Sequence, residues 1–113
     1  MAWQNTIGDG QNGLAATTIT AAGTTQATAT ILLAQDNDVT TVASGSGVVL
    51  TNLLLPGEQM TVFNAGANAL KVYPPTGLQI NALPTNTAMT LATNTGVMLR
   101  MVSTTRIFGV LSA

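Results

Sequence analysis

Apolar and β-branched residues alternate loosely with polar ones along most of the chain, and no helical spacing of apolar residues persists. β-branched side chains fit a pleated surface and lose rotamer freedom in a helix, so the pattern predicts strands. Gly, Asn, Asp and Pro gather between the apolar segments at intervals of about ten residues, as turns between short strands do. The expected strands lie near 16–21, 25–34, 38–43, 47–55, 59–65, 69–73, 77–81, 87–92, 97–103 and 106–112.

This succession of short strands predicts an all-β fold, an antiparallel β-sandwich or barrel of the jelly-roll-like kind. The first residues, MAWQNTIGDGQNG, show no alternation and are rich in Gly and Asn. We therefore expect an irregular N-terminal arm over 1–13 and a single β domain over 14–113. Trp3 favours an arm that it anchors on a protein surface, because an exposed indole is costly unless it docks. The alternative is a disordered terminal tail with an incidental Trp.

The turn residues predict how neighbouring strands pair. Gly66-Ala67 fits a two-residue type II′ turn, which would join 59–65 and 69–73 in a hairpin. In that register one face carries Thr61, Phe63, Leu70 and Val72, which we expect to form core. The opposite face carries Met60, Val62, Lys71 and Tyr73, and these four join Trp3 as candidate protein-interface residues.

Turn residues also predict strand pairing in the last third of the chain. A turn at 93–96, with Gly96 at positive φ, would join 87–92 to 97–103. A second turn at Thr104-Thr105 would make 97–103 a central strand. Both faces of that strand are apolar apart from Arg100, which is typical of a strand covered on both sides.

Tyr73-Pro74-Pro75-Thr76-Gly77 predicts a sharp corner between two β-segments. A residue before Pro is pushed towards an extended conformation, and Pro itself has no N–H for a strand ladder. Gly77 can close the turn.

Charged residues make up only 6% of the chain, against about 25% in an average domain. With 46% hydrophobic residues, the chain has little to keep its copies apart, so we expect other protein to cover much of its surface. A homo-oligomer is expected. The three basic residues are scattered and cannot follow a phosphate backbone, so nucleic acid is not an expected partner.

The composition also argues against catalysis. There is no Cys or His, which removes thiolate sites, the commonest general base and the commonest metal ligand. Asp36 and Asp38 lie together in QDND, which we interpret as a β-turn using Asx side chains. GDGQNG (8–13) matches a dinucleotide-binding motif in letters only, because the required strand and helix do not flank it. We expect no enzyme, no catalytic residue, no metal and no cofactor.

Apolar runs such as ILLA and LLL are far shorter than the roughly 20 residues of a membrane span, so no membrane is expected as a partner. The first residues show no basic segment followed by an apolar one, which predicts that no signal peptide is present. We expect synthesis in a cytoplasm.

From Glu58 onward the order of motifs is distinctive. A strand ending in N-x-G is followed by V-Y-P-P-T-G-x-x-I-N-x-L, an N-T-rich hairpin and a final apolar strand. This half of the chain resembles small structural proteins of tailed bacteriophage virions, particularly capsid decoration (cement) proteins and related fibre modules. The resemblance implies a trimeric all-β domain on the capsid surface of the virion, synthesised in the host cytoplasm. It would clamp neighbouring major capsid protein subunits and stabilise the assembled head.

A second hypothesis is a receptor- or glycan-binding module of a phage tail fibre or spike. Sugar sites usually present aromatic faces beside Asp, Asn and Arg, and aromatic residues are only 4% of this chain. A ligand-binding barrel or minor enzyme is a third reading, which no constellation of residues supports.

Overall fold

The computed structural model describes residues 14–112, and these form ten β-strands and no helix. The strands are β1 (Ala15–Thr20), β2 (Thr30–Leu32), β3 (Asp36–Thr41), β4 (Gly47–Leu50), β5 (Gln59–Asn64), β6 (Leu70–Tyr73), β7 (Gln79–Ile80), β8 (Met89–Leu91), β9 (Thr95–Met101) and β10 (Arg106–Leu111). Each overlaps an expected strand, so the all-β prediction is confirmed. The strands expected at 25–34 and 47–55 are shorter in the structure, because residues 24–29 and 51–58 form turns and loops.

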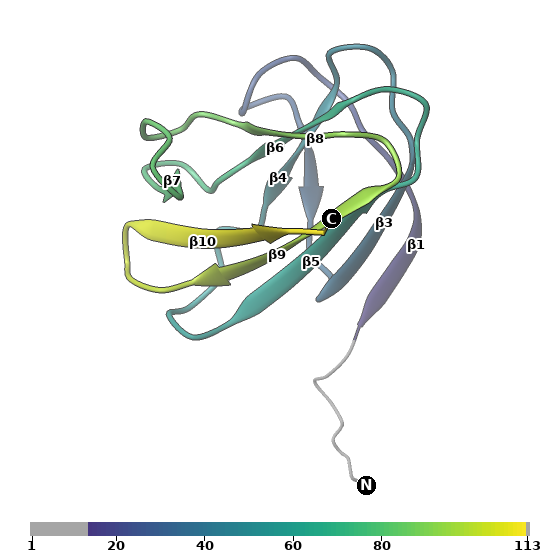
Figure 1. Cartoon of the computed structure of the whole chain (residues 1–113). Helices are drawn as coiled ribbons and strands as arrows, with labels where there is room; N and C mark the ends of the chain where they lie inside the picture. Colours follow the sequence, from purple (N-terminus) through teal and green to yellow (C-terminus); the bar gives the residue numbers. More distant parts are fainter. Residues whose placement is uncertain (1–13, 113) are drawn as a thin grey trace, which may run out of the picture.

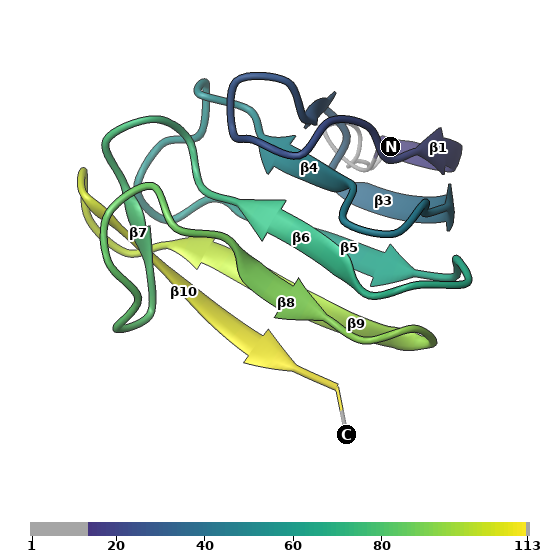
Figure 2. The ribbon, with the colours of Figure 1, turned by 90° about the horizontal axis from the view of Figure 1, so that it is seen from above.

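The strands form two sheets that lie face to face as stacked layers (Figure 1, Figure 2). Sheet A has six strands in the order β1-β3-β5-β9-β10-β7. Sheet B has four, in the order β2-β4-β6-β8. The chain crosses from one layer to the other after nearly every strand, and only β9 and β10 follow one another within a sheet.

The first six strands wind rather than fold back. β1, β3 and β5 are neighbours in sheet A and all run parallel, while β2, β4 and β6 do the same in sheet B. This alternation is the winding of a β-solenoid. The expectation of an antiparallel, jelly-roll-like arrangement is therefore wrong for this part of the chain.

The last strands reverse direction and close the stack. β8 runs antiparallel to β6 in sheet B, and β9 runs antiparallel to β5 in sheet A. β10 then pairs with β9 through a turn at residues 102–105, which confirms that residues 97–101 belong to a central strand. β7 adds two residues to the outer edge of β10.

The expected hairpin at Gly66-Ala67 is wrong, because β5 and β6 lie in different sheets. Asn64 is the physical reason. Its Nδ2 donates to Asn68 O and Leu91 O, both at 2.9 Å, and its Oδ1 accepts from Gly66 N, so the chain turns out of sheet A at this point. Gly66 is needed for space rather than for positive φ, since a Cβ there would lie 2.5 Å from Val42 Cγ2.

The expected hairpin at 93–96 is wrong for the same reason. β8 belongs to sheet B and β9 to sheet A, so these residues form a corner between the layers. Asn94 takes the left-handed conformation, with φ of 60°, in place of Gly96. The corner predicted at 74–77 is confirmed: the chain leaves sheet B after Tyr73, Gly77 has φ of 90°, and β7 begins in sheet A.

The core fills the space between the sheets and is almost wholly aliphatic. It includes Leu32, Val39, Val48, Leu50, Met60, Val62, Leu70, Val72, Ile80, Leu91, Val97, Leu99 and Ile107. Leu70 and Val72 are core residues, as expected. The face assignment of the preceding strand is inverted, because Met60 and Val62 are 3% and 1% exposed while Phe63 points outward with 43% exposed.

QDND is not a turn. Asp36, Asn37 and Asp38 begin β3 and pair in register with Thr61, Val62 and Phe63 of β5. The alternation therefore places Asn37 towards the core and the two Asp residues on the outer face of sheet A.

Candidate protein-binding surfaces

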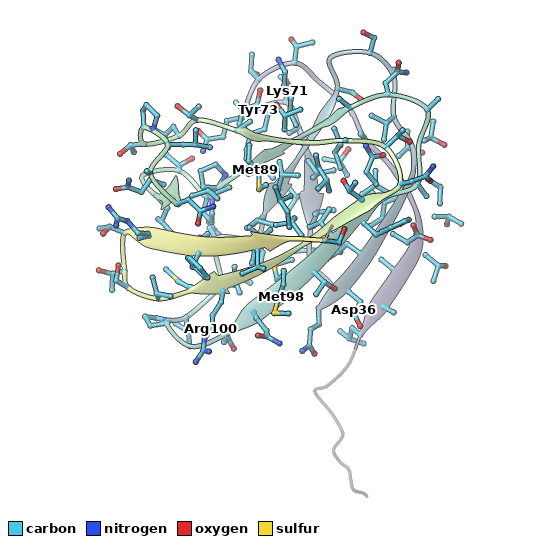
Figure 3. The ribbon with its side chains drawn as sticks, in the orientation of Figure 1. Asp36, Lys71, Tyr73, Met89, Met98 and Arg100 are labelled. Carbon is cyan, nitrogen blue, oxygen red and sulfur yellow. The ribbon has the colours of Figure 1, made fainter. Side chains whose placement is uncertain are left out.

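The outer face of sheet A carries a continuous group of apolar side chains. Phe63, Met98, Phe108 and Val110 are each between 43% and 53% exposed, and we call these four the outer band. Met98 pairs with Val110, and Phe108 is opposite Arg100, so three of the four residues come from the β9–β10 hairpin. Figure 3 shows Met98 and Arg100 on the side of sheet A that points away from sheet B.

A hollow opens in the middle of this face. Phe63 is opposite Gly96 in the sheet, and the missing side chain leaves a depression of about 370 Å³. Its walls include Phe63, Met98, Val110 and Ser112. Gly96 is tightly flanked, since a Cβ would lie 3.3 Å from Phe63 Cδ1. The hollow is thus shaped to receive an apolar side chain.

Polar groups flank the outer band on two sides. Arg100 is exposed beside Phe108, and Asp36 and Asp38 lie on β3 beyond Thr61 and Phe63. Thr61 Oγ1 donates to Asp36 Oδ1, which satisfies that oxygen. Asp38 Oδ1 is buried and receives no hydrogen bond from the described residues. An apolar centre with a polar rim is the usual anatomy of a protein-binding surface.

A second apolar surface lies where the chain passes from sheet B back to sheet A. Leu14, Leu33, Leu53 and Leu54 line a groove of about 540 Å³ there, and we call these residues the leucine corner. Glu58 borders the groove, but its Oε1 accepts from Leu55 N at 2.8 Å and so holds the local turn.

The structure divides the five predicted interface residues. Met60 and Val62 lie in the core and cannot form a surface, so their assignment is wrong. Lys71 and Tyr73 share the outer face of sheet B, as expected (Figure 3). Lys71 is exposed, and its interface role stays a prediction. Trp3 lies outside the described residues.

Tyr73 is buried by its own chain. The loop at residues 21–29 covers it, with Tyr73 OH donating to Thr24 O at 3.1 Å. Gln26 Nε2 donates to Pro74 O at 2.7 Å and holds the same loop. The hydroxyl and ring of Tyr73 therefore serve the fold, and an interface role for its side chain stays a prediction.

Sequence reasoning missed the outer band. The predicted hairpin register pairs Phe63 with Leu70 and so places it in the core, but β5 and β6 lie in different sheets. In β9, Arg100 is the signal that could have identified the outward face, because Met98 shares that face by alternation. β10 gave no comparable signal, because Phe108, Val110 and Leu111 are all apolar and exposed.

The described residues contain no group of three or more His, Cys, Asp and Glu that could hold a metal ion. They include no helix long and apolar enough to cross a membrane. Residues 43–46 form the turn between β3 and β4, with Gly45 at φ of 80°. GDGQNG lies outside the described residues.

Comparison with known proteins gives no relative: no family model, curated protein or solved structure matches the chain.

Proposed function

We propose that this chain is a non-enzymatic capsid decoration (cement) protein, which binds the assembled phage head and stabilises it by bridging neighbouring major capsid protein subunits. The observation that carries the proposal is the outer band, four large apolar side chains exposed together on one face of the larger sheet. The resemblance of residues 58–111 to phage virion proteins supplies the context of a capsid.

The outer band is the surface proposed to meet the capsid. Burying apolar area yields about 25 cal/mol per Å², and the four side chains lie on adjacent strands where one partner surface can cover them together. The hollow beside Gly96 would receive an apolar side chain of the capsid protein. Arg100 at the rim would fix the orientation through a carboxylate of the partner.

The stabilising effect follows from mass action. A protein that binds the assembled shell and not the free subunits shifts the equilibrium towards the shell. Many copies on one lattice multiply the effect, because each copy that bridges two subunits opposes their separation. We expect the chain to form a trimer, which would present three outer bands to the capsid. Light scattering in solution, which measures the mass of the particle, is expected to give the mass of a trimer.

The test is co-sedimentation with capsids from which the decoration protein has been stripped. Met98→Glu places a charge at the centre of the outer band and is expected to reduce the bound fraction at least tenfold. The matched control is Thr90→Glu, an exposed strand residue on the outer face of sheet B, which is expected to bind as the unmodified chain does.

Both variants change exposed side chains, so circular dichroism and the melting temperature are expected to stay unchanged. Val110→Lys serves as a second outer-band variant should Met98→Glu fail to fold. Equal binding by the outer-band and control variants would remove this surface from the proposal. Binding to host cells but not to capsids would replace the proposal with the receptor-binding hypothesis.

A further inference from the structure

Four methionines lie in the described part of the chain, and the structure separates one of them from the other three. Met60, Met89 and Met101 are 3%, 8% and 7% exposed and belong to the core, whereas Met98 is 46% exposed. Figure 3 shows Met98 on the outer side of sheet A and Met89 between the two sheets. The chain has no Cys, so the thioethers of its methionines are its only sulfur groups.

Access decides which sulfur an oxidant reaches. Peroxide converts a thioether to a sulfoxide on contact, so a core Met reacts only when its part of the structure opens. Met98 needs no opening, because it forms part of the wall of the hollow beside Gly96 and nearly half of its surface meets solvent. Folding therefore protects three of the four described thioethers and presents the fourth.

We propose that Met98 is the site at which peroxide modifies the folded chain, and that its sulfoxide switches off the outer band as a binding surface. The sulfur lone pair attacks one oxygen of hydrogen peroxide, a sulfur–oxygen bond forms and the O–O bond breaks. The departing hydroxide takes up the proton of the transferred hydroxyl and leaves as water. Sulfur is thus oxidised by two electrons and the peroxide is reduced by two. The site assignment stands on the free chain alone, whereas the switch rests on the proposed function.

The switch follows from the polarity of the sulfoxide. Its oxygen is a hydrogen-bond acceptor placed among Phe63, Val110 and the other side chains around the hollow. The hydroxyl of Thr61, which is opposite Met98 in the sheet, already donates to Asp36 Oδ1. An apolar partner surface that covers the band would therefore bury an acceptor without a donor, which opposes binding. Methionine sulfoxide reductases restore the thioether, so the switch is reversible.

Mass spectrometry of the folded chain after brief treatment with dilute hydrogen peroxide tests the site without any partner. Tryptic cleavage after Arg100 places Met98 and Met101 in different peptides, and fragmentation within the first peptide separates Met98 from Met89. Met98 is expected to gain oxygen several-fold faster than the three core methionines. Met101 is the internal control, because it lies on the same strand with its side chain in the core. In denaturant the rates are expected to converge.

Co-sedimentation with stripped capsids tests the switch. The peroxide-treated chain is expected to bind several-fold less than the untreated chain, and treatment with the reductases is expected to restore binding. Met98→Leu keeps an apolar side chain without sulfur, so this variant is expected to bind as the unmodified chain does and to lose nothing in peroxide.

Each half of the proposal has its own contrary result. Oxidation of Met98 no faster than that of Met101 in the folded chain would overturn the site. Equal loss of binding by Met98→Leu and by the unmodified chain in peroxide would overturn the switch, as would failure of the reductases to restore binding should the variant fold poorly. An untreated chain that does not bind capsids would overturn the proposed function and the switch together, while selective oxidation of Met98 in the free chain would still support the site.

Discussion

Asn64 is fully buried, yet every hydrogen-bonding group of its side-chain amide is engaged. Two N–H bonds go to Asn68 O and Leu91 O, and its oxygen accepts from Gly66 N. These bonds tie the corner after β5 to β8 of the other sheet. A buried polar residue with all of its hydrogen bonds made thus decides where the chain changes layers.

Replacing Asn64 with Ala should therefore destabilise the protein strongly. It leaves two carbonyls and one N–H without their partner, and a buried polar group left unpaired costs about 1–3 kcal/mol. We expect the free energy of unfolding, measured by denaturant titration, to fall by about 3 kcal/mol or more. Asn68→Ala is the control: it removes one bond, to Val42 O, from an exposed side chain and should cost about 1 kcal/mol. Equal losses for the two variants would contradict the role given to Asn64.

At the scale of the elements, the positions of the strands follow from sequence, whereas their partners do not. Alternation with a period of two is the same in a parallel winding and in an antiparallel hairpin. Short loops at 65–69 and 92–94 suit either arrangement, so hairpins were expected where corners occur. Only the β9–β10 hairpin was paired correctly.

The face that each strand turns towards the core also could not be predicted without knowing the partners of the strand. Leu70 and Val72 were assigned to the core correctly, but pairing them with β5 as a hairpin turned Phe63 inward and Met60 outward. In the structure β6 has β4 and β8 as its neighbours, so that register does not exist. The outer band depends on which strands are neighbours in sheet A, and the sequence alone does not specify those neighbours.

The outer edge of sheet A illustrates how an element is protected. β7 pairs with β10 only at residues 106 and 107, and the side chain of Asn81 continues the pairing. Its Oδ1 accepts from Gly109 N at 2.9 Å and its Nδ2 donates to Gly109 O at 3.3 Å. The amide therefore occupies the groups that an intruding strand would use.

Asn81→Gly should expose that edge while preserving the backbone, since Asn81 has φ of 52° and Gly tolerates positive φ. We expect faster aggregation, followed by light scattering at raised temperature. Asn94→Gly is the matched control, with φ of 60° but a place at a corner between the sheets. The edge role of Asn81 is contradicted by equal aggregation of the two variants.

The molecule as a whole combines parallel windings, formed by β1 to β6, with antiparallel strands that close the stack. The first windings contact only their neighbours in the stack, whereas the pairing of β5 with β9 joins the windings to the closing strands. Stability in stacked repeats is built from such neighbour contacts, so it need not be uniform along the chain.

Hydrogen exchange in increasing denaturant should reveal this gradient. Amides of β5 and β9 are expected to exchange only through global unfolding, while those of β1 and β2 open in a smaller step with a weaker denaturant dependence. The two-residue β7 should exchange fastest among the strands. One common opening free energy for all strands would show instead that the stack unfolds as a single cooperative unit.

The parallel windings have a consequence for how such a chain can change in length. A further winding inserted between β4 and β5 would find the same strand edges on both sides and would add one strand spacing, about 4.8 Å, to each layer. The antiparallel strands at the far end would still close the stack. Length is therefore a variable that duplication of one segment can alter, with the outer band and its hollow carried along unchanged on β5, β9 and β10.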